Sequence, residues 1–285
     1  MTAEDTWTVK RLLNWTRDFF KNKGIEKPQL EAEILLAHAM KIKRIELYTA
    51  FESEPTEAQR AIFRDSVKRR GNGEPTAYLT GSKEFYSLLF KVDHNVLIPR
   101  PETEDLVLLT LDKIKTYSDA PVIADVGTGS GIIAITLAKH SAAQIIAVDV
   151  SPEALNIAQH NAKTHGVADR IDFRQSDLLE QVPESLDIVV SNPPYISQSE
   201  YEALPVDVKN FEPRTALLAG ANGIDVIERL IPQSASRLSP GGLLLMEVSP
   251  MIAESVASLL ADWNDVQILT DSAGRQRIVQ GVRPR

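Results

Sequence analysis

The sequence predicts an α/β protein, with a doubly wound, mostly parallel sheet preceded by a small helical bundle. Apolar runs alternate with helical patterns after residue 121, which is typical of parallel strands joined by crossover helices. The region before residue 75 shows only helical periodicity. With 285 residues and 43% hydrophobic side chains, the chain can bury the core that such a fold requires.

Apolar side chains at helical spacing predict the first helices: Leu12, Trp15, Phe19 and Phe20, then Leu30, Ile34, Leu35 and Ala39. Gly24 and Pro28 separate these two helices. A third helix is expected from about Pro55 to Gly71. Its basic residues could contact a charged partner, although a solvated helix face is the better interpretation: Arg60, Arg64, Lys68, Arg69 and Arg70.

A linker with a β-hairpin is expected next. Residues 85–98 have β-type spacing around Asp93-His94-Asn95, which predicts the hairpin there. We therefore expect a helical domain at residues 1–75, a linker with the hairpin at 76–98, and an α/β domain at 99–285.

Strands of the α/β domain are predicted at Val122–Val126, 145–150, Ile171–Gln175 and 186–190, with helices at 132–138 and 154–162. Two further strands, 266–270 and 277–282, flank a turn at 271–274. A turn of this length is too short for a parallel crossover. The last two strands should therefore be antiparallel.

Composition narrows the possible environments and partners. The chain has no cysteine, which excludes disulfides and thiolate metal sites and fits a reducing compartment. No apolar run approaches the roughly 18 to 20 residues of a membrane span, and residues 1–5 are polar and acidic rather than signal-like. The net charge of −8 gives no general attraction to phosphate backbones. We expect a cytoplasmic enzyme with no metal, no membrane association and no direct nucleic-acid binding.

A glycine-rich loop follows the first strand of the sheet and opens a helix. Its residues are Gly127, Thr128, Gly129, Ser130 and Gly131. Glycines allow a sharp turn and a close approach of the backbone to a ligand, so this loop predicts a nucleotide-type cofactor. A dinucleotide fingerprint requires another glycine at the position of Ile132, which makes NAD the weaker candidate.

Two acidic residues end the next two strands. Asp149 lies about 20 residues after the glycine loop, where a carboxylate can accept from both ribose hydroxyls. An N-cap role is the alternative, but Ser151 before Pro152 already supplies that helix start. Asp177 could accept from an adenine amino group while Leu178 covers the ring, although a capping role for Asp177 is equally plausible. Together these residues match the cofactor site of class I S-adenosylmethionine-dependent methyltransferases.

The fourth strand leads into Asn192-Pro193-Pro194-Tyr195, at the carboxyl end of the sheet. An amide or exocyclic amino nitrogen is a weak nucleophile because its lone pair is delocalised. The Asn192 side-chain oxygen can accept one N–H and the Pro193 carbonyl the other, which aims the nitrogen at the methyl donor. The prolines stiffen the loop and remove competing N–H donors. We assign Asn192 to the cofactor site as well.

Tyr195 is expected to pack on the planar acceptor group, with an ordinary buried aromatic as the alternative. No strong base is required, because methylation makes the nitrogen acidic enough to lose its proton to water or to a backbone acceptor. The histidines are accordingly expected to be structural or exposed: His38, His94, His140, His160 and His165.

Motifs that the chain shares with a known enzyme family are found along nearly its whole length: residues 31–36, 73–75, 78–81, 85–86, 97–104, 127–131, 192–195, 211–213 and 241–242. With them the chain closely resembles the HemK/PrmC family, the protein-(glutamine-N5) methyltransferases that modify the Gly-Gly-Gln loop of class I translation release factors. The octapeptide at 97–104 resembles this branch and differs from the sister enzymes that modify a ribosomal protein. Residue chemistry alone gives only the reaction class.

The resemblance implies a Rossmann-like sheet of seven strands with an antiparallel last strand, and a helical domain that recognises the substrate. It implies S-adenosylmethionine as methyl donor, S-adenosylhomocysteine as product and class I peptide chain release factors as partners. Within the octapeptide, Arg100 and two acids could line the cofactor mouth or form a salt bridge between the domains. The chain departs from the family at Ser249-Pro250-Met251, where a glycine is usual, and this leaves the local backbone and the role of Glu247 open.

Three alternatives remain from the residues alone. An amino methyltransferase for adenine or another nucleic-acid base would present the same NH₂ geometry to Asn192, but base flipping needs a basic groove that the acidic balance does not favour. A ribosomal-protein glutamine would fit the same chemistry. A protein that binds the cofactor or a ribosomal partner without turnover would have no use for the intact acceptor loop.

Overall fold

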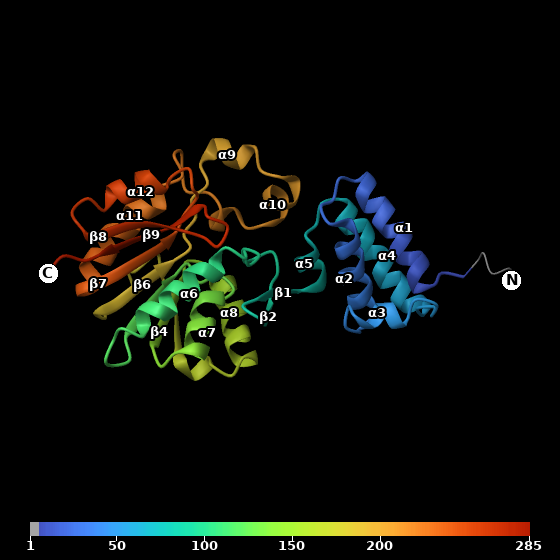
Figure 1. The fold of residues 1–285 in the computed structure, drawn as a ribbon, viewed down its shortest axis with the longest axis horizontal. Helices are drawn as coiled ribbons and strands as arrows, with labels where there is room; N and C mark the ends of the chain where they lie inside the picture. The colour runs from blue at the N-terminus through green and yellow to red at the C-terminus, as the bar shows by residue number, and fades with distance from the viewer. Residues whose placement is uncertain (1–5) are drawn as a thin grey trace. The chain divides into compact units, whose positions relative to one another are not determined.

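The computed structural model describes residues 6–285. Residues 1–5, on which the expectation of no signal peptide partly depends, lie outside the described residues. The chain divides into two compact units (Figure 1): a helical unit, residues 1–81 with 206–211, and an α/β unit, residues 82–205 with 212–285. The boundary expected after residue 75 falls inside the helical unit.

The helical unit contains the three predicted helices, α1 (Val9–Asn22), α2 (Pro28–Met40) and α4 (Glu57–Gly71). The helix α4 begins after Thr56 rather than at Pro55, because the Thr56 side chain accepts from the backbone of Gln59 and completes a capping box. Three short helices were not predicted: α3 (Glu46–Thr49), α5 (Thr76–Thr80) and α10 (Val206–Phe211). Side chains from α1, α2 and α4 form the core of this unit, including Leu13, Phe20, Leu35, Leu36 and Phe63.

The hairpin lies earlier than the sequence indicated. Strands β1 (Ser82–Phe85) and β2 (Leu88–Lys91) pair antiparallel through Tyr86 and Ser87, whose φ angles are 50° and 58°. These are the left-handed conformations of a tight hairpin turn, where Asn or Gly is usual, so the composition gave no signal for it. The expectation of a hairpin centred on Asp93-His94-Asn95 is therefore wrong. There the Asp93 side chain instead accepts from the backbone N–H of Asn95.

The α/β unit is built on a sheet of seven strands in the order β5-β4-β3-β6-β7-β9-β8. The strands are β3 (Val122–Val126), β4 (Gln144–Asp149), β5 (Ile171–Gln175), β6 (Leu186–Ser191), β7 (Leu238–Glu247), β8 (Asn264–Thr270) and β9 (Gln276–Val282). From β5 to β7 all pairings are parallel, whereas β9 pairs antiparallel with both β7 and β8. The predicted mostly parallel sheet with antiparallel final strands is confirmed.

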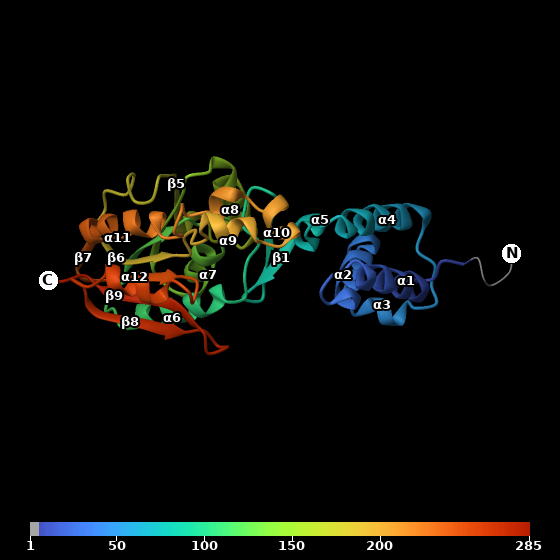
Figure 2. The same ribbon diagram turned by 90° about the horizontal axis from the view of Figure 1, so that it is seen from above.

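Helices cover both faces of this sheet (Figures 1 and 2). One face packs against α6 (Thr103–Ile114), α7 (Ile132–His140) and α8 (Pro152–Thr164). The other packs against α11 (Asp225–Arg237) and α12 (Ala253–Leu259). A sheet buried on both faces explains why its strands read as continuous apolar runs, and the predicted doubly wound arrangement is confirmed.

The order of the strands determines where a ligand can bind. From β3 the sheet continues to β4 on one side and to β6 on the other. Open α/β sheets bind ligands at such a switch point, at the carboxyl ends of the strands. Val126 and Ser191, which end β3 and β6, are paired in register, so the segments that follow them start side by side. Among residues 6–285, no helix combines the length and the apolar character needed to cross a membrane.

Candidate active site

A cavity of about 380 Å³ opens at the carboxyl ends of β3, β4, β5 and β6. It brings together these residues that the sequence assigned to the site: Gly127, Gly129, Asp149, Asp177, Leu178, Asn192 and Pro194. Its volume lies within the range of about 300 to 1,000 Å³ that small-molecule sites occupy. The other assigned residues do not line it: Thr128, Ser130, Gly131, Pro193 and Tyr195.

The glycine loop is held in shape by the buried carboxylate of Asp125. One Asp125 oxygen accepts from the Thr128 hydroxyl at 2.7 Å and from the Ala134 backbone N–H at 3.0 Å. Burial raises the pKa of Asp125 to about 7, against these hydrogen bonds, which lower it. Thr128 therefore fastens the loop to the start of α7 instead of lining the cavity.

Gly131 shows why this loop requires glycine. Its φ is +84°, and a Cβ atom there would lie 2.8 Å from Ile135 Cδ1 and 3.3 Å from the Ala158 backbone. A larger residue would separate α7 from α8, because the close packing of these two helices leaves no space for a side chain. The preceding residue, Ser130, contributes its carbonyl, which accepts from the buried Asn161 side chain at 2.9 Å.

Asp149 lines the cavity at the end of β4. Its two carboxylate oxygens accept from the backbone N–H groups of Gly129, at 2.9 Å, and Ser151, at 3.0 Å. Burial raises the pKa of Asp149, opposed by these backbone hydrogen bonds. The Ser151 side chain caps α8 by accepting from Ala154 N, which confirms the predicted helix start and leaves Asp149 free of a capping role.

Asp177 and Leu178 follow β5 and line the same cavity. Asp177 accepts from Arg229 Nη2 of α11 at 2.6 Å, and both side chains are about half exposed. Sequence reasoning did not find Arg229, because nothing in the pattern of α11 distinguishes it from a solvated basic residue. Leu178 has a φ of 54°, an uncommon conformation for a leucine.

The loop after β6 is fixed at both ends. Ser191 donates its hydroxyl to the Val126 carbonyl at 2.7 Å, and Ile196 donates its backbone N–H to Leu217 O at 3.0 Å. Between these anchors, Asn192 Nδ2 donates to the Thr103 hydroxyl oxygen at 3.2 Å. With its nitrogen held by Thr103, the Asn192 oxygen is the end of the amide available to a ligand.

Tyr195 packs against the apolar core on the α11 and α12 side of the sheet. Burial, with the nearby Glu247 carboxyl, raises the pKa of Tyr195 to about 12. Glu247 itself ends β7 and is almost completely buried. Burial raises its pKa to about 7, whereas the Thr103 hydroxyl and Arg277 lower it.

Two motifs that lie far apart in the sequence meet beside the cavity. Arg100 donates to the buried Glu212 carboxylate, which also accepts from Ile98 N at 3.1 Å. Both side chains belong to the α/β unit, so this ion pair does not join the two units. The interpretation of Arg100 as one half of a salt bridge between domains is therefore wrong. Residues of the segments on either side of this ion pair, 95–97 and 213–216, line the cavity: Asn95, Val96, Leu97, Pro213, Thr215 and Ala216.

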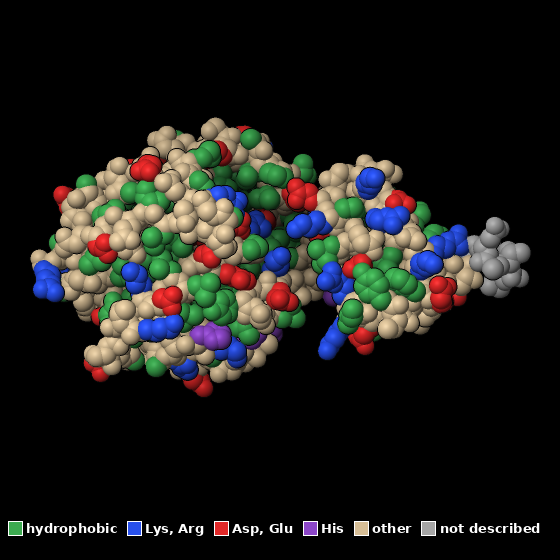
Figure 3. Space-filling view, in the orientation of Figure 1, with side chains coloured by type: hydrophobic (Ala, Val, Ile, Leu, Met, Phe, Trp, Pro, Cys, Tyr) green, Lys and Arg blue, Asp and Glu red, His purple; other side chains and the backbone are tan. Residues whose placement is uncertain are grey.

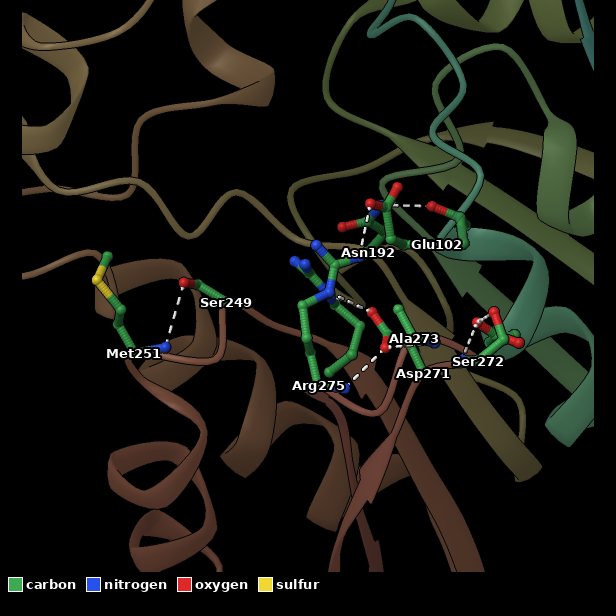
Figure 4. Close-up of polar contacts among 11 residues, drawn as sticks. Glu102, Asn192, Ser249, Met251, Asp271, Ser272, Ala273 and Arg275 are labelled. Carbon is green, nitrogen blue, oxygen red and sulfur yellow. Dashed lines mark hydrogen bonds and ion pairs between the residues drawn. The ribbon is translucent and has the colours of Figure 1, made fainter.

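The departure at residues 249–251 forms a turn between β7 and α12. Ser249 accepts from Met251 N through its side chain and from Ile252 N through its carbonyl, at 3.3 and 3.1 Å. Figure 4 shows Ser249 and Met251 of this turn beside Arg275, which donates to both Glu102 and Asp271. The chain thus closes the turn by a side-chain hydrogen bond where glycine would rely on backbone freedom.

None of the five histidines lines this cavity, and four of them, all except His165, are exposed. His165 Nε2 lies 3.0 Å from the Leu89 carbonyl oxygen, a structural contact. Within residues 6–285, no group of three or more His, Asp or Glu side chains is arranged to hold a metal ion.

Family models match two parts of the chain, the PrmC N-terminal domain at residues 11–81 and the methyltransferase small domain at residues 104–207. The release factor glutamine methyltransferase of Rhodopirellula baltica is 50% identical over 98% of this chain and 97% of its own length. Those of Koribacter versatilis and Nitratidesulfovibrio vulgaris are 42% and 39% identical, over 97% and 95% of this chain and 99% and 94% of their own lengths.

Solved structures share the fold at lower identity. The hMettl16 catalytic domain, solved in complex with an RNA hairpin, aligns with a TM-score of 0.57 at 19% identity, over 77% of this chain and 82% of its own. A methyltransferase from Pyrococcus furiosus aligns with a TM-score of 0.53 at 14% identity, over 81% of this chain and 100% of its own. These similarities support the fold alone.

Proposed function

The chain belongs to the release factor glutamine methyltransferase family, and from this premise we propose that it methylates the side-chain amide nitrogen of the glutamine in the Gly-Gly-Gln loop of class I release factors. The observation that carries the proposal is the orientation of Asn192. Its amide nitrogen is bound to Thr103, and its oxygen is left as an acceptor at the edge of the cavity formed by the glycine loop. An acceptor-only group at this position suits a donor NH₂.

The residues around the cavity fit S-adenosylmethionine, which supplies an electrophilic methyl group when it is bound. Asp149 would accept from the ribose hydroxyls, Asp177 would accept from the adenine amino group, and Leu178 would cover the ring. Gly127 and Gly129 expose backbone at the cavity wall, where no side chain prevents close approach. Asn192 borders this same cavity and thereby places the acceptor beside the donor.

The loop at residues 192–195 supplies what amide methylation requires. Asn192 Oδ1 and the Pro193 carbonyl each take one N–H of the acceptor amide, so the nitrogen lone pair is directed out of the amide plane. Holding two reactants in the productive geometry is worth several kcal/mol of barrier, up to about 7 to 11 in well-oriented systems. Tyr195 would limit rotation of the acceptor group. After transfer the nitrogen loses a proton to water, and no histidine is required.

A nucleic-acid amino methyltransferase is less favoured by the charges. The chain carries a net charge of −8. On the face of the α/β unit drawn in Figure 3, acidic and basic side chains are interspersed rather than gathered into a basic groove. Recognition of a duplex or a flipped base depends on such a groove.

The helical unit is proposed to recognise the body of the release factor. It carries a cavity of about 530 Å³ between α1 and α4, with apolar walls from Trp7, Leu12, Trp15, Phe19, Phe63 and Val67. Trp15 was expected on the apolar face of α1, but its side chain is 52% exposed and stacks on Phe19 beside this cavity. Arg60, Arg64 and Lys68 border the same cavity together with Glu57, which pairs with Arg60 at 2.8 Å and with Arg64 at 3.6 Å. Lys68 therefore carries the positive charge that would meet an acidic side chain on a mainly apolar partner surface.

The reaction is tested by incubating the enzyme and labelled S-adenosylmethionine with a purified class I release factor, then locating the label by peptide mass spectrometry. Label on the glutamine of the Gly-Gly-Gln loop supports the proposal. A release factor with asparagine in its place keeps the amide but withdraws it by one methylene, on the order of 1.5 Å, and should be a poor substrate. Preferential labelling of DNA, RNA or a ribosomal protein in parallel reactions would overturn the assignment.

A further inference from the structure

The turn that follows β5 is fastened to α11 at two points. Arg229 Nη2 donates to Asp177 Oδ2 at 2.6 Å, and Gln233 Oε1 accepts from the Leu179 backbone N–H at 2.8 Å. Arg229 and Gln233 are four residues apart, so they lie on the same face of α11. This helix therefore fixes both the Asp177 carboxylate and the backbone two residues later.

The ion pair between Arg229 and Asp177 lies at the cofactor cavity. Both residues line its wall, as does Val226, which precedes Arg229 by about one turn of α11. The two charged side chains are 50% and 45% exposed, and an ion pair this exposed adds little to the stability of a fold. Its main consequence is therefore expected in the cavity, where it fixes the direction of the Asp177 carboxylate.

The Asp177 carboxylate keeps one oxygen for a ligand. Within residues 6–285, Oδ2 pairs with Arg229, whereas Oδ1 has no hydrogen-bond or ion-pair partner. The backbone N–H of the next residue, Leu178, is likewise unused in the hydrogen bonds of the described part of the chain. Two neighbouring residues of the cavity wall thus offer one acceptor and one donor.

This combination is complementary to one edge of adenine. The 6-amino group of adenine is a donor and the adjacent N1 is an acceptor, so they would meet the Asp177 oxygen and the Leu178 N–H. Hypoxanthine has a carbonyl oxygen in place of the amino group and carries a hydrogen on N1. With that base, acceptor would face acceptor and donor would face donor. A carboxylate held in one direction therefore discriminates between the two bases.

We propose that Arg229 is a positioning residue that makes the cofactor site specific for adenine, because it occupies Asp177 Oδ2 and leaves Oδ1 to accept from the 6-amino group. The inference rests on the proposed function, since it concerns the base of S-adenosylmethionine. Without Arg229, the Asp177 side chain can change rotamer and accept from water instead. It would then contribute less to binding an amino group and would no longer oppose a carbonyl oxygen.

The test measures the Kd of two ligands on the full chain by titration calorimetry. S-adenosylhomocysteine carries adenine, and S-inosylhomocysteine carries hypoxanthine on the same ribose and amino acid. The variants are Arg229→Met, Arg229→Lys, Asp177→Asn and the double variant that combines Arg229→Met with Asp177→Asn. The matched control is Arg237→Met, because Arg237 lies on the same helix but does not line the cavity.

The wild type should bind S-adenosylhomocysteine about 30- to 100-fold more tightly than S-inosylhomocysteine, because two hydrogen bonds are exchanged for two unfavourable contacts. In Arg229→Met this ratio should fall to about tenfold or less, mainly through weaker binding of the adenine ligand. Arg229→Lys keeps a cation for the carboxylate and should keep most of the ratio. Arg237→Met should stay within about twofold of the wild-type ratio.

The double variant shows whether Arg229 acts through Asp177. Asp177→Asn should lower the ratio at least as far as Arg229→Met, because an amide can present either its oxygen or its NH₂ to the base. Adding Arg229→Met to Asp177→Asn should then change the ratio no further. Losses that add in the double variant would overturn the inference, because Arg229 would then act on the ligand independently of Asp177.

An unchanged ratio in Arg229→Met, or equal losses in Arg229→Met and Arg237→Met, would also overturn the inference. Arg229 is half exposed, so its replacement should not prevent folding. The ratio compares two ligands on one preparation, so a partial loss of folded protein does not change it. A wild-type enzyme that does not methylate the release factor refutes the proposed function. One that methylates it but does not discriminate between the two bases refutes this inference alone.

Discussion

Arg100 donates a hydrogen bond to the buried Glu212 carboxylate at 2.6 Å, although the two residues lie 112 positions apart in the sequence. Arg100→Met should lower the free energy of unfolding by about 2 to 3 kcal/mol, because it leaves that carboxylate buried with Ile98 N as its remaining donor. Adding Glu212→Gln should recover part of the loss. Urea denaturation measures both. Equal stability of wild type and Arg100→Met would contradict this prediction.

Asp149→Ala should weaken S-adenosylmethionine binding by about 1.5 to 3 kcal/mol, as expected for the loss of charge-assisted hydrogen bonds to the ribose. Part of this loss of affinity comes from the hydrogen bond that Asp149 accepts from Gly129 N at 2.9 Å. Titration calorimetry measures the change. Glu180→Ala, which removes an exposed carboxylate that does not line the cavity, is the control and should bind normally. Unchanged affinity in Asp149→Ala would remove this residue from the site.

Asn192→Ala should separate chemistry from binding. The methyl-transfer rate should fall by about 10²-fold or more, because the acceptor amide loses its positioning partner. The affinity for S-adenosylmethionine should stay within a few fold, since Asp149 and the glycine loop remain. Single-turnover kinetics and calorimetry on the same preparation provide the comparison. A large loss of cofactor affinity would show that Asn192 acts mainly in the donor site.

Glu247→Gln should change how stability depends on pH. The folded-state pKa of Glu247 is raised from 4.5 to about 7, so its favourable contribution is fully present below pH 4.5 and is lost as the pH rises through about 7. The variant should therefore become more stable relative to wild type between these values, by at most about 3 kcal/mol. Thermal denaturation at a series of pH values checks the sign. If the stability of Glu247→Gln relative to wild type instead increased toward low pH, the prediction would be wrong.

Trp15→Ala with Lys68→Glu should impair recognition of the intact release factor without impairing the chemistry. We expect kcat/KM for the whole protein to fall by about tenfold or more, as for the loss of an aromatic anchor and an attractive charge. Methylation of a short peptide that contains the Gly-Gly-Gln loop should be unchanged. Lys43→Glu, an exposed charge reversal that does not line the cavity, is the control. Equal losses with both substrates would place the defect outside recognition.

The sheet could be predicted from the sequence because each buried strand carries its own apolar run. The acceptor loop, Asp149 and Asp177 could be placed because residues that follow parallel strands gather at the carboxyl edge of the sheet. The position of the β1–β2 hairpin could not be predicted, because Tyr86 and Ser87 adopt positive φ angles that their side chains do not favour. Arg229 and Thr103 contact Asp177 and Asn192, which are distant in sequence, and local patterns do not reveal such pairings.

The helical unit is discontinuous along the chain, because α10 joins it from residues 206–211. Val206 and Phe211 lie against Gly73, where a Cβ atom would be 3.3 and 3.5 Å from their side chains. During synthesis on the ribosome, residues 6–81 therefore emerge long before the last element of their own unit. Domains usually complete their folding in order from the N-terminus. Here a nascent chain should gain full protease resistance in the helical unit only after residue 211 has left the exit tunnel. At that point four of the seven sheet strands, β3 to β6, precede residue 211, and β7, β8 and β9 have still to follow.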